Sequence, residues 1–187
     1  MARHYIRHYY LNDTIYFLTV HTVKRKCLLD SDERKKVLFE TITKIFRKNN
    51  YHLYAWAIFD DHFHLLFKTR IGKHFPEIVK AIGVHCAAEI KNLESKHRIG
   101  TLFFNYWDIC LRTKDEFYRY FNLIHCNAQK HGYAKRDGKY IFSSFRFWQW
   151  RRNDIWLKQL QKDFPIDGLK LKEDESLHQV SEIVARG

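Results

Sequence analysis

Two histidines separated by one residue give this sequence its clearest potential for chemistry. His62 and His64 flank Phe63 within an apolar run that is typical of a β-strand. Side chains two residues apart on a strand project to the same face, so we expect both imidazoles to point one way and Phe63 the other. Two imidazoles side by side can hold one divalent cation, which can polarise a phosphodiester oxygen. With 12 histidines in the chain, such a pair could also arise by chance.

The charge balance indicates a polyanion as partner. Lys and Arg number 33 against 21 Asp and Glu, which gives a net charge of +12. Basic side chains that neutralise phosphates release counterions, and this release favours binding. A basic protein without such a partner is the alternative. The chain contains no run of 18 apolar residues and no signal peptide, so we expect no membrane partner and a cytoplasmic location.

The elements that must position the histidines follow from the hydrophobic periodicity. It predicts strands over residues 15–23, 51–58, 62–69 and 103–111, and helices over about 30–50, 76–96 and 115–130. This β-α-β-β-α-β order, followed by a helix, is the ferredoxin-like α+β arrangement: an antiparallel sheet with two helices on one face. We expect one domain over residues 1–158 and a charged tail over residues 159–187. The cysteines form no CxxC pair, which predicts buried, reduced thiols at Cys27, Cys86, Cys110 and Cys126.

The residues around the histidine pair carry a resemblance to a known family. The segment from Trp56 to Phe67 resembles the HUH motif of single-strand nucleases and transposases that use a tyrosine nucleophile. Three further segments are similar to the REP-associated tyrosine transposases within that group: residues 7–20, residues 123–132 and Ser143-Ser144-Phe145. The resemblance covers roughly residues 5–150, in order.

The resemblance implies a substrate, a cofactor and a reaction. The substrate is single-stranded DNA containing a hairpin, and the cofactor is Mg²⁺ or Mn²⁺ held by His62, His64 and a helix side chain. A tyrosine attacks the DNA backbone, which leaves a 5′-phosphotyrosine link and a free 3′-hydroxyl for rejoining. Asn127 is the candidate third ligand, because an amide oxygen suits a hard cation. A helix-terminal hydrogen bond is its alternative role.

The third predicted helix departs from the family pattern. The expected nucleophile falls at position 123, which is leucine, and an alkyl side chain cannot attack phosphorus. Of the nearby tyrosines, Tyr118 lies on the opposite helical face from Asn127 and Tyr120 on the same face. Tyr120 is therefore the candidate nucleophile, with a core aromatic as its alternative role. The seven residues from Tyr120 to Asn127 rise roughly 10 Å, against about 6 Å for four residues, so Tyr120 lies farther from Asn127 than the family's tyrosine would.

Basic residues near the motif are candidate DNA contacts. Arginines alternate with aromatic residues between Phe142 and Trp156, and unpaired bases stack on such rings while guanidinium groups bind phosphates. The alternative is that the aromatics pack on the sheet and the arginines are solvated. His131 could contact phosphate or favour the end of its helix as a cation. The candidate contacts are Lys24, Arg25, Lys26, His131, Arg146, Arg151 and Arg152; Arg3 and Arg7 could clamp a hairpin stem.

Three functions remain open on the sequence. The leading one is metal-dependent nicking and rejoining of single-stranded DNA, of the DNA-transposition type. The main alternative is a catalytically degenerate DNA-binding or regulatory relative, because of Leu123. A third is an RNA-binding module, since aromatic-bearing βαββαβ sheets also bind RNA. The oligomeric state, monomer or dimer, stays open.

Overall fold

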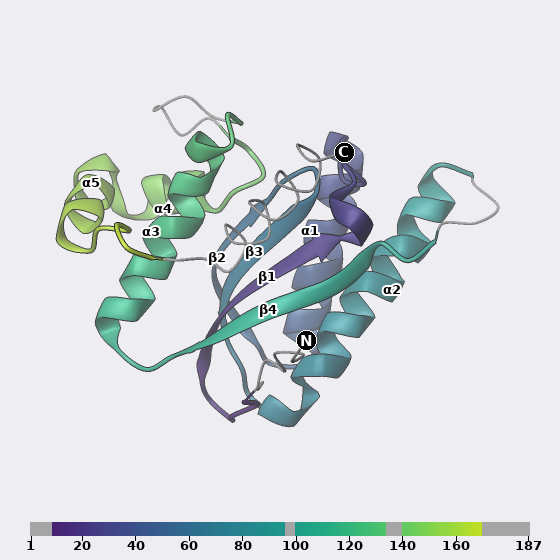
Figure 1. Ribbon diagram of the computed structural model, residues 1–187, viewed down its shortest axis with the longest axis horizontal. Helices are drawn as coiled ribbons and strands as arrows, with labels where there is room; N and C mark the ends of the chain where they lie inside the picture. Colours follow the sequence, from purple (N-terminus) through teal and green to yellow (C-terminus); the bar gives the residue numbers. More distant parts are fainter. Residues whose placement is uncertain (1–8, 96–99, 134–139, 170–187) are drawn as a thin grey trace, which may run out of the picture.

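Four antiparallel strands form one sheet. The computed structural model describes residues 9–95, 100–133 and 140–169, so Arg3 and Arg7 lie outside the described residues. The strands are β1 (Ile15–Thr22), β2 (His52–Ile58), β3 (His62–Lys68) and β4 (Phe103–Leu111), in the order β2-β3-β1-β4 (Figure 1). Neighbouring strands pair antiparallel throughout. This order confirms the predicted α+β, ferredoxin-like fold.

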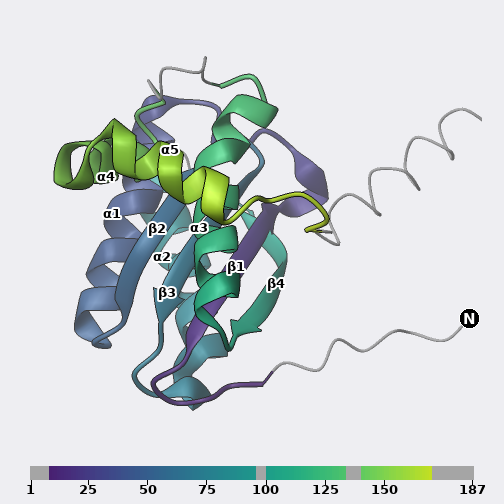
Figure 2. The same ribbon diagram turned by 90° about the vertical axis from the view of Figure 1, so that its left-hand side faces the viewer.

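Helices cover both faces of the sheet (Figures 1 and 2). The helices α1 (Asp32–Lys48) and α2 (Phe75–Leu93) lie on one face, as predicted. The other face carries α3 (Lys114–Lys130), and α4 (Phe145–Arg152) and α5 (Asp154–Asp163) pack with it. The periodicity did not predict α4 and α5, or the short 3-10 helices η1 (Val23–Arg25) and η2 (Gly72–His74).

Strand alternation divides the core into two clusters. Odd and even residues of β1 face opposite sides, so Leu18 packs with α1 and α2 while Phe17 packs with α3. On β3, Phe63 and Leu65 join the α1–α2 cluster and Leu66 joins the α3 cluster. His62 and His64 alternate with Phe63 and Leu65 along β3 and therefore face α3.

Local sequence signals fix the helix that covers the histidines. Thr113 and Glu116 form a capping box at the start of α3, in which each side chain accepts a hydrogen bond from the other residue's backbone N–H. Gly132, just beyond the end of α3, has a φ of +76°, a left-handed conformation that glycine adopts without strain. At the start of α1, Oγ of Ser31 accepts a hydrogen bond from the backbone N–H of Arg34 and caps the helix.

The packed part of the chain extends beyond the expected domain boundary. Residue 158 lies inside α5, whose buried Leu160 joins the α3 cluster together with Leu169. Residues 170–187 lie outside the described residues. All four cysteines are free; Cys86 is buried as expected, whereas Cys27 is exposed. Within the described residues, no helix has the length and apolar character to span a membrane.

Candidate metal and nucleic-acid site

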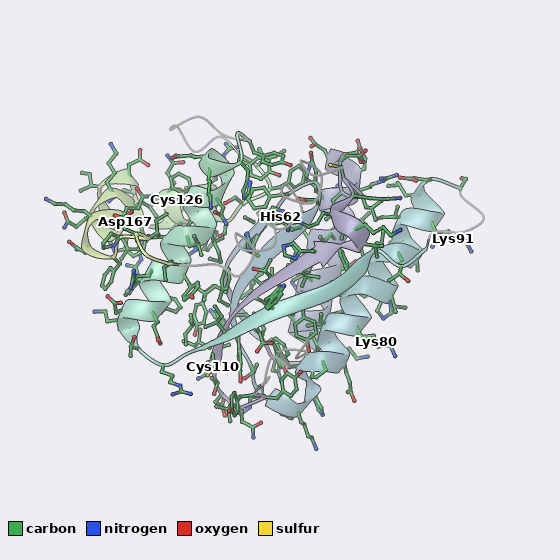
Figure 3. The ribbon with its side chains drawn as sticks, in the orientation of Figure 1. His62, Lys80, Lys91, Cys110, Cys126 and Asp167 are labelled. Atoms are coloured by element: carbon green, nitrogen blue, oxygen red, sulfur yellow. The ribbon has the colours of Figure 1, made fainter. Side chains whose placement is uncertain are left out.

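The two histidines of β3 lie together under α3. Their ring centroids are 4.9 Å apart, and the side chains are 3% (His62) and 0% (His64) exposed. Both project to the same face, as strand alternation predicts, and α3 covers that face. Ala57 pairs with His64 in the register of β2, so a small side chain leaves room beside the imidazole. Figure 3 shows His62 near the centre of the molecule, with Cys126 marking the adjacent part of α3.

A side-chain oxygen fixes the Nδ1 atom of each imidazole. The Nδ1 of His62 lies 2.6 Å from Oδ1 of Asp61, and the Nδ1 of His64 lies 2.8 Å from Oγ1 of Thr19. When Nδ1 carries the proton and donates it to these oxygens, Nε2 is the atom that can bind a metal. The Nε2 of His62 is buried, and no hydrogen-bond partner for it lies within the described residues.

Asn127 reaches this pair from α3. Its side chain is 2% exposed, and its Nδ2 lies 2.9 Å from Nε2 of His64. Rotation of the Asn127 amide by 180° would exchange Nδ2 and Oδ1. Nδ2 suits a hydrogen bond to Nε2 of His64, whereas Oδ1 in that place suits a bound cation. The amide oxygen is a ligand that Mg²⁺ and Mn²⁺ favour. The two imidazole nitrogens are ligands typical of divalent transition metals. Nε2 of His62 is buried without a hydrogen-bond partner within the described residues, so the donor set fits a divalent cation.

The described residues contain no group of three or more His, Cys, Asp or Glu side chains arranged to hold a metal ion. The set formed by His62, His64 and Asn127 has only two members of these types. An ion held by three protein ligands would keep coordination positions for oxygens of water or DNA. This is the arrangement expected of a reactive centre, whereas a structural metal site is closed by protein ligands.

Two further imidazoles surround the pair. His21 lies opposite His62 in the β1–β3 register, with ring centroids 5.8 Å apart, and His131 approaches His62 to 5.1 Å from the end of α3. Burial lowers the pKa of His21 to about 3 and holds the pKa of His64 well below its ordinary value. Burial also lowers the pKa of His131. These three imidazoles are therefore neutral at neutral pH, which is the form that binds metals.

Arg25 lies beside the pair and is oriented by the backbone. Its Nε is 3.5 Å from Oδ2 of Asp61, and its buried Nη1 has no hydrogen-bond partner within the described residues. Lys24 and Arg25 both adopt left-handed backbone conformations, with φ of 55° and 54°. Lys24 and Lys26 are exposed on either side. Of the predicted basic cluster, Arg25 therefore points toward the histidines while the two lysines face solvent.

Asp61 links Arg25 to His62. Burial by itself would raise the pKa of the Asp61 carboxyl, but the hydrogen bond and charge of His62 and the charge of Arg25 hold it below its ordinary value. Asp61 is therefore ionised at neutral pH. A carboxylate that accepts from Nδ1 also raises the basicity of the imidazole as a ligand.

The candidate nucleophile lies one ring away from the histidines. The Tyr120 ring packs on Phe17 with centroids 4.7 Å apart, and Phe17 stacks on His64 at 5.5 Å. Tyr120 is 8% exposed, and burial raises its pKa. Leu123 is buried in the apolar α3 cluster. Tyr118 packs on Phe164, away from the histidines, as the helical geometry predicts.

The Ser143-Ser144-Phe145 segment joins α4 to the sheet. Ser143 forms an isolated antiparallel bridge with Ala57. The Oγ of Ser144 accepts from the backbone N–H of Trp56 at 3.0 Å and lies 2.8 Å from Nε2 of the buried His125. These contacts place α4 at the edge of β2. The arginines that follow, Arg146, Arg151 and Arg152, are exposed.

Sequence reasoning missed His21, Thr19 and Asp61 as members of the site. Thr19 and His21 become neighbours of the pair only through the pairing register of β1 with β3, which the residues of β1 do not reveal. Asp61 immediately precedes His62, so its position in the turn could have drawn attention. The predicted DNA contacts fall into two groups. His131 and Arg25 lie beside the histidine pair, whereas the arginines of α4 are exposed on a separate surface.

Fold and site together define a class: a ferredoxin-like domain with paired histidines on a central strand beneath a helix. The model of the family described as "Transposase IS200 like" matches residues 11–107. This chain belongs to that family.

Similar proteins agree with this assignment. The REP-associated tyrosine transposase of Escherichia coli (strain K12) is 24% identical over 144 residues, which cover 74% of this chain and 81% of that protein. A solved structure described as a REP-associated tyrosine transposase bound to a REP hairpin superposes with a TM-score of 0.66 at 21% identity. The match covers 76% of this chain and 83% of the other. At this identity the likeness shows that the two proteins share a fold.

Proposed function

We propose that this chain binds hairpin-forming single-stranded DNA and holds Mg²⁺ or Mn²⁺ with His62, His64 and Asn127. The orientation of the two imidazoles carries the proposal. Each Nδ1 is fixed by a side-chain oxygen, an arrangement that metal-ligating histidines almost always have. A buried ring nitrogen without a partner destabilises the folded state by about 1–3 kcal/mol. Ligation of an ion by Nε2 of His62 removes that penalty.

Each polar group of the site has a task in this proposal. A bound divalent ion would polarise a phosphodiester oxygen of the DNA. The neutral imidazole of His64 binds without first losing a proton. Asp61 accepts from Nδ1 of His62 and so leaves Nε2 of His62 to bind the ion. Nη1 of Arg25, which lacks a partner within the described residues, would donate to a phosphate oxygen beside the ion. Lys24, Lys26 and His131 would contact neighbouring phosphates of the DNA backbone.

Three observations favour hairpin DNA as the partner. The net charge of +12 suits a polyanion. A solved structure with the same fold holds a REP hairpin. Helices also cover both faces of the sheet, so the open aromatic sheet face by which RNA-recognition folds stack bases is not available. The RNA-binding alternative is therefore disfavoured.

Nicking and rejoining through Tyr120 is a second candidate function. It is favoured because Tyr120 contacts Phe17, which stacks on His64. The phenolic oxygen would attack phosphorus and lose its proton, and the bond to the 3′ oxygen would break. The products are a 5′-phosphotyrosine and a free 3′-hydroxyl. The side chain must first leave the Phe17 ring, and Leu123 offers no hydroxyl nearer to Asn127. These two requirements make DNA binding the primary proposal.

A hairpin-binding and trapping assay tests both functions. Single-stranded hairpin DNAs from the neighbourhood of the coding gene are incubated with protein and Mn²⁺, and the products are run on native and denaturing gels. The proposal expects hairpin binding, together with Mn²⁺ binding that His64→Ala abolishes. His52→Ala, at an exposed histidine of β2, is the matched control and should leave Mn²⁺ binding unchanged.

The outcomes separate the two candidates. A covalent band that disappears in Tyr120→Phe establishes nicking with a displaced nucleophile. Hairpin binding without a covalent band supports recognition alone. No hairpin binding by the wild type, or Mn²⁺ binding that survives in His64→Ala, would contradict the primary proposal.

A further inference from the structure

The outer face of α4 presents two aromatic rings to solvent. Trp150 is 80% exposed and Phe147 is 55% exposed. Their ring centroids lie 6.4 Å apart with planes inclined at 48°. They are three residues apart on the helix, so they share one side of it. Together they form an exposed pair of large rings, which we call the α4 aromatic pair.

The other side of α4 explains why these rings stay outside. Trp148 packs against Phe121 at 5.4 Å and stacks on Trp156 at 6.0 Å. Its Nε1 donates to the backbone carbonyl of Tyr54 at 2.9 Å. Phe145 also contacts the α3 cluster. Because α4 is anchored by these inward residues, rotation that buried Trp150 would expose Trp148 and break its hydrogen bond.

Positive charge surrounds the aromatic pair. Arg146 and Arg151 are exposed and lie four residues from Trp150 and Phe147 respectively, on the same side of α4. The helix contains no acidic residue. The adjacent Asp154 accepts a hydrogen bond from Nε2 of Gln149 at 2.7 Å. The exposed Lys158 adds a further cation on α5. The surface is therefore complementary to a polyanion that also carries flat rings.

We infer that the α4 aromatic pair is a stacking platform for unpaired bases of single-stranded DNA, with Arg146 and Arg151 binding the flanking phosphates. The inference rests on the proposed DNA binding and deepens it by assigning the unpaired part of the DNA to a defined surface. Base faces are accessible only outside a duplex, so the platform selects the single-stranded segment. Aromatic rings interleaved with arginines bind such strands with little sequence preference.

An oligothymidylate binding series tests the platform, because this DNA forms no hairpin. Fluorescence anisotropy of the labelled oligomer is measured with the full chain at several salt concentrations. Loss of one base stack weakens binding about tenfold. We expect that loss in Trp150→Ala, with an unchanged slope of log K against log salt, because stacking releases no counterions. Trp150→Tyr should keep most of the affinity.

Two further variants supply the controls. Ile155 is 79% exposed at the start of α5, so Ile155→Ala removes a similarly exposed apolar side chain without a ring and should bind like the wild type. Arg151→Gln should lower the salt slope by about 0.7 for one lost phosphate contact on a single strand. Thermal unfolding of Trp150→Ala should match the wild type, since this ring makes no buried contact.

The two levels of the proposal fail in different ways. Wild-type protein that binds neither oligothymidylate nor hairpin DNA overturns the proposed function. Wild-type binding that Trp150→Ala leaves unchanged overturns the stacking platform alone. A tenfold loss in Ile155→Ala equal to that in Trp150→Ala would also overturn it, because general apolar contact would then explain the effect.

Discussion

Replacing Thr19 by valine tests whether the histidine pair is arranged for a metal. Thr19 is 1% exposed, and its Oγ1 lies 2.8 Å from Nδ1 of His64. Valine keeps the branched shape and suits a strand, so the substitution removes one hydrogen-bond acceptor and little else. Nδ1 of His64 then loses the oxygen that fixes the tautomer and the ring orientation.

The expected effect can be stated for affinity and for stability. Loss of such an orienting partner lowers metal affinity by about 10- to 100-fold, or about 1.4–2.7 kcal/mol. Loss of this buried hydrogen bond should destabilise the ion-free protein by about 1–3 kcal/mol. Titration calorimetry with Mn²⁺ measures the first quantity, and urea unfolding without metal measures the second. Mn²⁺ should also stabilise Thr19→Val less than the wild type at equal concentration.

A matched control separates orientation from packing. Thr41 is 6% exposed in α1, on the other side of the sheet, so Thr41→Val makes the same atomic change away from the histidines. Its Mn²⁺ affinity should equal that of the wild type. If Thr19→Val loses stability but binds Mn²⁺ as tightly as the wild type, Thr19 is a structural residue and the reasoning from Nδ1 orientation is refuted.

Three further predictions concern the nucleophile, the arginine and pH. Leu123→Tyr should increase the yield of covalent DNA adduct in Mn²⁺ on denaturing gels, at a packing penalty of about 1–3 kcal/mol; a yield equal to that of the wild type would contradict it. Arg25→Gln should lower the salt slope of hairpin binding by about 0.9, for one lost phosphate contact on the stem; an unchanged slope would exclude that contact. Burial lowers the pKa of His125 to about 3, whereas the unfolded value is about 6.5. The unfolded state therefore takes up the proton first, and stability falls between pH 6.5 and 3 by about 1.4 kcal/mol per unit. Urea unfolding should show a shallower pH slope in His125→Gln.

The order of strands and long helices could be predicted because each has a clear hydrophobic period. The alternation in β3 also predicted that His62 and His64 share one face of the sheet and that Phe63 lies on the other, but not which helices cover each face. The eight-residue α4 was missed because aromatic residues occupy both of its sides. Trp148 and Trp150 are the same residue type in the same basic segment. Trp148 is anchored by its hydrogen bond to the carbonyl of Tyr54, whereas Trp150 is exposed. Only the tertiary contacts distinguish them.

Sequence reasoning grouped candidate residues most readily where neighbours in sequence are also neighbours in space. His62 and His64 are such a case, and resemblance added Asn127, which contacts His64. His21 required the register between two strands that are separated by α1 and β2. The geometry of Tyr120 required the position of Phe17, a residue on another strand. Helical spacing placed Tyr120 on the face of α3 that it shares with Asn127, but it could not show that the Phe17 ring lies between Tyr120 and His64.

The chain order of the elements has a consequence during protein synthesis. Residues 15–111 contain the four strands of the described sheet together with α1 and α2, whereas α3 begins at Lys114. Chains emerge from the ribosome amino-terminus first, so the sheet can assemble before α3 leaves the exit tunnel. Until α3 docks, the side of the sheet that bears His64 and Phe17 is uncovered. A sheet that assembled at that stage would leave the histidines accessible to metal ions and the apolar surface around them accessible to chaperones.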